Sequence, residues 1–160
     1  MTQTLKPSAH AEMAGDTIQT LRVQKEMLIK APPEIVFESI LEEMGPAATG
    51  ENGSPMPMKV EPWPGGRWYR DLGDNAGHLW GHVQVIKPPG LLEVCGPLFM
   101  SYPAISHVQY RLAAEDDATR LKFVHRAIGL IDPKHAKGVD QGWGEFLDEI
   151  RKIAERRNER

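Results

Sequence analysis

The feature that most constrains the fold is the stretch 132–157, in which apolar residues recur every three or four positions. This spacing places their side chains on one stripe of a helix with about 3.6 residues per turn, so a single amphipathic helix is predicted. Asp132 and Pro133 form a typical helix start, because aspartate can accept unpaired N–H groups and proline needs no hydrogen bond at the first helical position. The predicted stripe, which must be buried against another element, comprises Val139, Trp143, Phe146, Leu147, Ile150, Ile153 and Ala154.

Three glycines interrupt this helical pattern at positions 138, 142 and 144. Each weakens a helix by about 1 kcal/mol relative to alanine. Two explanations are open from the sequence. Either the absent side chains let a loop or a ligand approach the helix backbone, with Gly138 and Gly142 on one face, or the helix begins only near Asp140.

The chain upstream of this helix is patterned mainly as strands. Alternating apolar and polar residues predict a strand over 18–30, and Pro32 and Pro33 open a short helix that ends near residue 44. Further extended runs are predicted at 67–72, 78–87, 91–100, 105–114 and 119–128. Because the connections between them are short, an antiparallel meander is favoured. The sequence therefore predicts an α+β fold with one face of the sheet covered.

The segment 45–66 carries five prolines and five glycines. This density excludes a regular helix and leaves at most one short strand, at 56–60. Long segments without regular structure are either mobile or functional, and this one is the candidate for a lid or a mouth. Residues 1–16 are polar and show no period, which predicts a flexible tail followed by one domain over 17–160.

Composition and charge exclude several classes of protein. One cysteine, Cys95, excludes an internal disulfide and gives no sign of an oxidising compartment. A net charge of −3 argues against a nucleic-acid surface, which needs clustered Lys and Arg. No run has the apolar length of a signal peptide or a membrane span, so we expect a cytoplasmic protein without a membrane partner.

Several short motifs, taken in order, resemble one known superfamily. They are Trp63-Pro64-Gly65-Gly66-Arg67-Trp68, the stretches 81–89 and 119–125, and Gly142-Trp143 in the final helix. The chain resembles the SRPBCC (START and birch-pollen-allergen-like) superfamily, in the branch named after the C-terminal domain of the heat-shock-protein-90 ATPase activator. The resemblance implies a helix-grip fold, a curved antiparallel sheet of six to seven strands around a long C-terminal helix. It also implies an apolar cavity between sheet and helix.

His125 is the candidate for acid–base chemistry, because it continues the inward face of Leu121 and Phe123. Its alternative role is a core or cavity-lining histidine that bonds a backbone carbonyl. Catalysis would require a carboxylate, for which Glu93 is one candidate, or Tyr110 within hydrogen-bond reach. The predicted ligand-contacting residues are Trp63, Trp68, Val83, Val85, Val108, Tyr110, Phe123, His125, Trp143 and Leu147.

No metal site or cofactor is expected. His78 and His82 lie four residues apart, which on a strand is roughly 13 Å and too far for one ion. The Gly65-Gly66 pair lacks the spacing of a phosphate-binding loop and fits a tight turn or bulge at the edge of the sheet.

Three functions follow as hypotheses. The first is a protein that binds a small apolar or aromatic ligand between the sheet and the C-terminal helix. The second is a cyclase- or dehydratase-like enzyme that uses His125. The third is an interaction module of the chaperone-ATPase-activator kind. A homodimer through the edge run at 67–72 is also expected from edge-strand logic.

Overall fold

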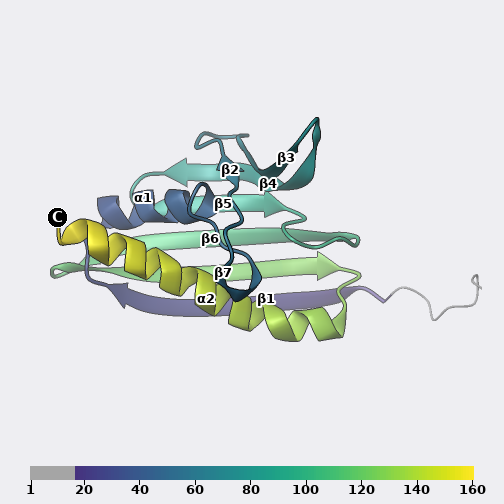
Figure 1. Ribbon diagram of the computed structural model, residues 1–160. Helices are drawn as coiled ribbons and strands as arrows, with labels where there is room; N and C mark the ends of the chain where they lie inside the picture. The colour runs from purple at the N-terminus through teal and green to yellow at the C-terminus, as the bar shows by residue number, and fades with distance from the viewer. Residues whose placement is uncertain (1–16) are drawn as a thin grey trace, which may run out of the picture.

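A computed structural model describes residues 17–160, and the predicted tail over 1–16 lies outside the described residues. Seven strands form one antiparallel sheet in the order β1-β7-β6-β5-β4-β3-β2 (Figure 1). The elements are β1 (Gln19–Ile29), α1 (Pro33–Met44), the 3-10 turn η2 (Glu51–Gly53), β2 (Lys59–Val60), β3 (Arg67–Gly73), β4 (Ala76–Lys87), β5 (Leu91–Gly96), β6 (Ala104–Glu115), β7 (Ala118–Gly129) and α2 (Pro133–Asn158).

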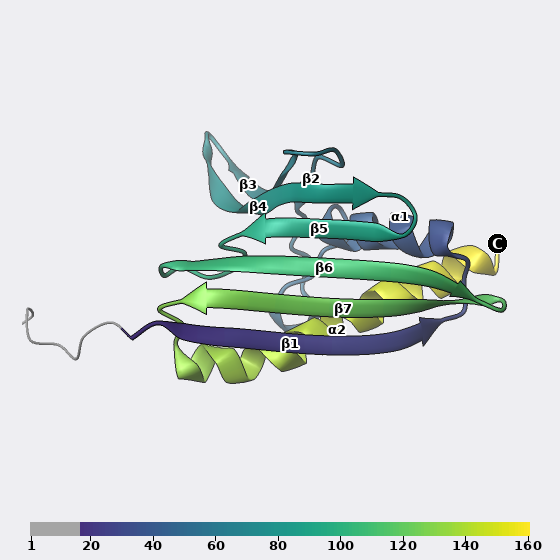
Figure 2. The ribbon, with the colours of Figure 1, turned by 180° about the vertical axis from the view of Figure 1, so that it is seen from behind.

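Both helices cover the same face of the sheet. In Figure 1 they lie in front of the strands, and in the reverse view of Figure 2 the strands lie in front of both helices. The long helix α2 runs obliquely across β7 and β1 and packs against α1 at its C-terminal end. This arrangement confirms the predicted α+β class and the helix-grip fold.

Helix α2 begins where the sequence places it. The Asp132 side chain accepts the Lys134 N–H at 2.8 Å, and the helix runs unbroken from Pro133 to Asn158. The alternative start near Asp140 is therefore wrong, and all three glycines lie inside the helix. Of the predicted apolar stripe, Phe146 is only partly buried; the buried members are Val139, Trp143, Leu147, Ile150, Ile153 and Ala154.

The register of β4 corrects one predicted position. Val83 pairs with the core residue Val94, but a β-bulge follows, and Val85 then lies opposite Glu93. The Glu93 side chain bonds His107 on the outer face of the sheet, so Val85 also points outward and Ile86 takes the inner position. The prediction that Val85 lines the cavity is wrong, because the bulge reverses the alternation on which it depended.

Two strands, β5 and β2, also differ from the expected ranges. β5 stops at Gly96, because Pro97 follows and Leu98 has a positive φ of 53°. β2 covers only Trp68 and Tyr69 of β3, and so becomes the edge strand there. The predicted homodimer through this edge stays a prediction.

Candidate ligand-binding groove

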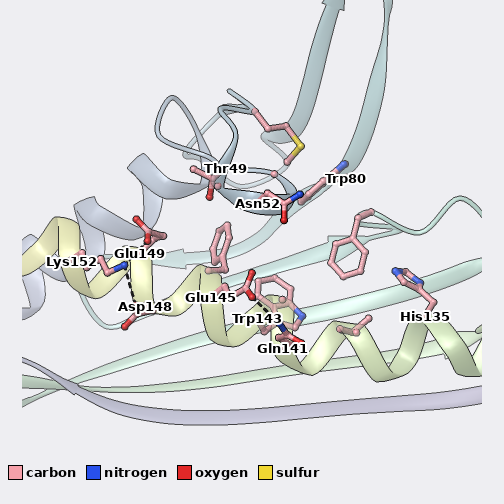
Figure 3. Close-up of a pocket in the computed structure, with 18 residues that line it drawn as sticks. Thr49, Asn52, Trp80, His135, Gln141, Trp143, Glu145, Asp148, Glu149 and Lys152 are labelled. Atoms are coloured by element: carbon pink, nitrogen blue, oxygen red, sulfur yellow. Dashed lines mark hydrogen bonds and ion pairs between the residues drawn. The ribbon is translucent and has the colours of Figure 1, made fainter.

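An open groove of about 940 Å³ lies between α2 and the loop 49–56 (Figure 3). Thr49 and Asn52 of this loop face α2 across the opening, and Trp80 of β4 lies at the far side. Its apolar lining consists of Met56, Trp80, Phe99, Val139, Trp143 and Phe146. We call this space the groove.

Backbone hydrogen bonds hold the loop that forms one wall. The Met56 N–H donates to the Ala48 carbonyl at 2.9 Å, and the Met58 N–H donates to the Gly45 carbonyl at 2.9 Å. Within the loop, the Gly50 N–H bonds the Ser54 carbonyl at 2.8 Å. The proline- and glycine-rich segment, predicted as a lid or mouth, thus supplies the wall opposite α2.

Aromatic side chains follow one another from the sheet to the helix. The ring centroids of Trp68 and Trp80 are 5.0 Å apart, those of Trp80 and Phe99 are 5.7 Å apart, and those of Phe99 and Trp143 are 6.2 Å apart. Phe146 continues the row at 5.4 Å from Trp143. These separations lie in the range of favourable edge-to-face contact, so the row forms one continuous aromatic wall.

His125 is hydrogen-bonded through both ring nitrogens inside the core. Its Nδ1 accepts the Trp143 indole N–H at 2.9 Å, and its Nε2 lies 2.9 Å from the Ser106 hydroxyl. Because an indole N–H can only donate, Nδ1 is unprotonated and Nε2–H donates to Ser106. Burial lowers the pKa of His125 to about 4, so the ring is neutral near neutral pH.

A catalytic His125 was expected to have Glu93 or Tyr110 within hydrogen-bond reach, but its hydrogen-bond partners are Trp143 and Ser106. The Tyr110 hydroxyl has no hydrogen-bond partner, and Glu93 bonds His107 and Gln109 on the outer face. Neither group is therefore bonded to His125. His125 is buried in the core and is held by two side chains, not by the backbone carbonyl expected for its alternative role.

Most of the predicted ligand-contacting residues form the core between the sheet and the middle of α2. Trp143 is the one that also lines the groove, and Trp63 is 55% exposed outside it. The open space therefore lies beside this core rather than within it. The predicted residues buried in the core are Trp68, Val83, Val108, Tyr110, Phe123, His125, Trp143 and Leu147.

Two glycines of α2 form part of the groove lining. A Cβ atom added at Gly138 or at Gly142 would meet no atom within 4 Å. Neither residue has a positive φ, so packing and backbone conformation both leave room for a side chain there. Gly144 does not line the groove, and a Cβ added there would lie 3.9 Å from the Lys25 ammonium. The groove thus owes part of its depth to absent side chains on α2.

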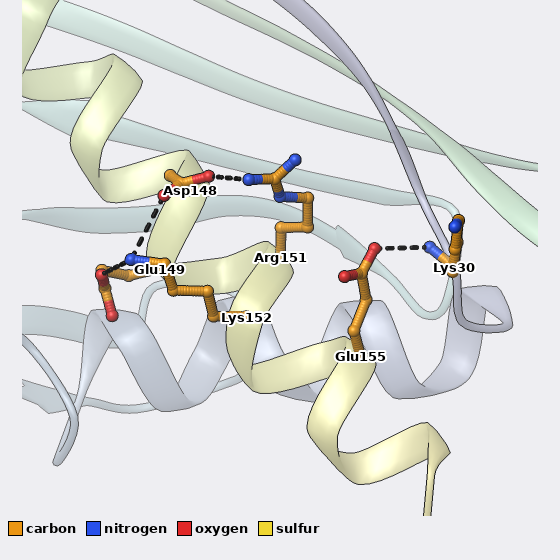
Figure 4. A network of polar contacts seen from close by, with 6 residues as sticks. All are labelled: Lys30, Asp148, Glu149, Arg151, Lys152 and Glu155. Atoms are coloured by element: carbon orange, nitrogen blue, oxygen red, sulfur yellow. Dashed lines mark hydrogen bonds and ion pairs between the residues drawn. The ribbon is translucent and has the colours of Figure 1, made fainter.

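The end of the groove nearer the C-terminus of α2 carries charged side chains. Lys152 lies 2.9 Å from Glu149 and 3.3 Å from Asp148, and Asp148 also pairs with Arg151 (Figure 4). The Glu145 carboxylate accepts a hydrogen bond from the Gln141 amide at 3.0 Å. Among the described residues, no cation pairs with Glu145.

A second acid lies buried behind this end. Glu43 of α1 is 1% exposed; its carboxylate accepts the Thr49 backbone N–H, and its Oε1 has no hydrogen-bond partner. Burial, and then the nearby Glu149 carboxylate, raise the pKa of Glu43 to about 7. The burial of Tyr110 itself, and then the charge of Glu43, raise the pKa of the Tyr110 hydroxyl. One carboxylate oxygen of Glu43 and the hydroxyl of Tyr110 are thus buried without a hydrogen-bond partner.

The opposite end of the groove is marked by His135. Its Nδ1 lies 2.6 Å from the Tyr102 hydroxyl, and its ring stands edge-on to Phe99 with centroids 5.6 Å apart.

Across the described part of the chain, no group of three or more His, Cys, Asp or Glu side chains could hold a metal ion. Over the same residues, no helix has the length and apolar character needed to cross a membrane.

Comparison with known proteins identifies the family. Residues 30–155 match the family model described as activator of Hsp90 ATPase homolog 1-like protein. The chain belongs to this family. This family is of the SRPBCC type, as the sequence motifs indicated. None of the curated proteins matches the chain.

Solved structures share the fold of this family member at low sequence identity. An uncharacterised protein from Rhizobium leguminosarum has a TM-score of 0.67 and 22% identity, with coverage of 88% of this chain and 97% of its own. Ara h 8.0201 has a TM-score of 0.62 and 12% identity, with coverage of 85% and 98%. DynU16 has a TM-score of 0.61 and 17% identity, with coverage of 84% of this chain and 47% of its own.

Proposed function

We propose that the protein binds a small apolar or aromatic molecule in the groove between α2 and the loop 49–56. The observation that carries this proposal is the pair of glycines in the groove lining. Gly138 and Gly142 weaken α2 by about 1 kcal/mol each, yet no neighbouring atom requires their small size. A ligand seated against the helix backbone would require it.

Size and chemistry support the same proposal. The groove's volume of about 940 Å³ lies within the range of about 300–1,000 Å³ typical of small-molecule sites. Trp80, Phe99 and Phe146 are partly exposed in the lining and offer apolar ring surface, which suits a ring system. A structural neighbour, DynU16, is a protein in the dynemicin biosynthetic locus, which agrees with a role near a small organic molecule.

The enzyme hypothesis through His125 has less support. Its two ring nitrogens are already bonded, to Trp143 and Ser106, and it does not line the groove. The interaction hypothesis rests on the family description, which names activation of the Hsp90 ATPase. Stimulation of a purified Hsp90 ATPase by this protein would support that hypothesis, and no stimulation would count against it.

The four tryptophan indole N–H signals in a nitrogen–proton NMR spectrum provide the test. A panel of naphthalene, indole and steroid compounds should shift the signals of Trp80 and Trp143, which line the groove, and spare the exposed Trp63. We expect Gly142→Leu to lower the affinity of any binder at least about tenfold, because its side chain enters the groove.

Gly144→Leu is the matched control for this experiment. It makes the same change in the same helix, but its side chain points toward the flexible end of Lys25 and not into the groove. Both variants should fold, since leucine favours a helix more than glycine does. Equal binding by wild type and Gly142→Leu, or no binder in the panel, would contradict the proposal.

A further inference from the structure

The groove joins an aromatic wall to an acidic end. Resting on the proposed function, we infer that its ligand is an amphipathic cation, an apolar or aromatic body that carries an ammonium group seated at the Glu145–Glu149 end. The inference concerns the charge of the ligand. It is independent of which ring system fills the aromatic part.

The first observation is the balance of charge at that end. Glu145 and Glu149 are four residues apart and lie on one face of α2, as does Lys152 of the next turn. Lys152 forms ion pairs with Asp148 at 3.3 Å and with Glu149 at 2.9 Å, and Arg151 forms an ion pair with Asp148. Glu145 therefore adds a negative charge that no described cation neutralises, and an incoming ammonium can pair with it.

The second observation is the buried carboxyl group behind the same end. The Oε1 atom of Glu43 is buried without a hydrogen-bond partner. The Glu43 carboxylate accepts a hydrogen bond from the Thr49 backbone N–H and is repelled by the Glu149 carboxylate. Thr49 and Glu149 both line the groove. A buried carboxylate in this position lacks a cation, and a ligand ammonium in the adjacent groove would provide one.

The other groups that face Glu43 do not supply that cation. Glu149 approaches from α2 and Glu42 from its own helix, and both carry negative charge. Glu42 is itself paired with Arg157, and the Tyr110 hydroxyl of β6 is neutral with a raised pKa. The field at this end of the groove is therefore negative, and it opposes a carboxylate or phosphate ligand.

The aromatic wall acts in the same direction. The faces of Trp80, Trp143 and Phe146 carry the negative part of the ring quadrupole and attract a cation. An ammonium attached to a ring system can thus place the ring on this wall and the charge beside Glu145. An anion of identical shape would lose both interactions.

Isothermal titration calorimetry with three naphthalenes of matched shape tests the inference. Naphthylethylamine, naphthylethanol and naphthylacetate share the ring and differ in charge. At about pH 8 we expect the amine to bind at least about tenfold more tightly than the acetate, with the alcohol between them. Equal affinities, or a preference for the acetate, would overturn the inference while the proposed function stands. No binding by any of the three would overturn the inference, and the wider panel followed by the tryptophan signals would then decide the proposed function by itself.

Two variants assign the preference to the acidic end. Glu145→Gln should lower the affinity for the amine toward that for the alcohol, and leave the alcohol unchanged. Glu159→Gln makes the same change at an exposed position about 21 Å further along the helix axis and should change neither. The wild-type affinity for the amine should also rise between about pH 6 and pH 8, as Glu43 loses its proton. An unchanged amine-to-acetate ratio in Glu145→Gln would contradict the assignment.

Discussion

Replacing Trp143 with alanine is expected to lower the free energy of unfolding by about 3–5 kcal/mol. The indole is 4% exposed and packs on Phe123 with ring centroids 4.5 Å apart. It also donates the hydrogen bond to His125 Nδ1, so its removal leaves a buried acceptor unpaired as well as a cavity. Urea denaturation followed by far-ultraviolet circular dichroism measures the change.

Two further variants separate packing from hydrogen bonding. Trp143→Phe keeps an aromatic ring but removes the donor, so a loss of about 1–3 kcal/mol is expected from the unpaired His125 nitrogen. Trp63→Ala, at a residue that is 55% exposed, should cost about 0.5 kcal/mol or less. A Trp143→Ala variant as stable as Trp63→Ala would show that the core is not organised around this indole.

The second large effect concerns the dependence of stability on pH. The pKa of Glu43 is about 7 in the folded protein against 4.5 as the reference value. Between these values the folded state holds a proton that the unfolded state has lost, so stability falls as the pH rises through this window. Glu43→Gln removes the titration and should be more stable than wild type by about 3 kcal/mol at about pH 8, relative to their difference at about pH 4.

Urea denaturation of both proteins across this pH range makes the comparison. Glu34→Gln is the control, because it makes the same change at an exposed position of the same helix. It should follow the wild-type pH profile within about 0.5 kcal/mol. A Glu43→Gln profile parallel to that of wild type would mean that Glu43 ionises normally in the folded protein.

The fold was predictable because its elements carry strong local signals. Helix α2 has an unambiguous apolar stripe and an Asp132-Pro133 start, and its predicted range is nearly the observed one. The strands β6 and β7 alternate cleanly, since one face is buried and the other meets water. The tight turn at Gly65-Gly66 was also predictable from the glycine pair. A Cβ at Gly66 would lie 1.9 Å from the Glu61 carbonyl oxygen, so only glycine fits there.

The groove was not predictable in the same way. Periodicity identifies which residues face inward, but it does not distinguish those that fill the core from those beside an open space. Tyr110 and Phe123 fill the core, whereas Trp80 and Phe99 reach the groove because the loop 49–56 and α2 meet next to them. The bulge that turns Val85 outward likewise has no signature in the residues around it.

Two local signals did point toward the site. The glycines at 138 and 142 were inconsistent with an optimal helix, and one of the two explanations for them was the approach of a ligand. The irregular segment 45–66 was expected to form a mouth, and it supplies the opposing wall. Glu43 gave no such signal, since a glutamate near the end of an amphipathic helix is ordinarily exposed.

Native mass spectrometry of the protein purified from its own organism most directly tests the claim that the groove holds a small molecule. We predict an added mass on wild type that disappears on denaturation, persists in Gly144→Leu and is missing from Gly142→Leu. The added mass should belong to a compound with an ammonium group. A wild-type protein without added mass, or an added mass that Gly142→Leu retains in full, would contradict the account.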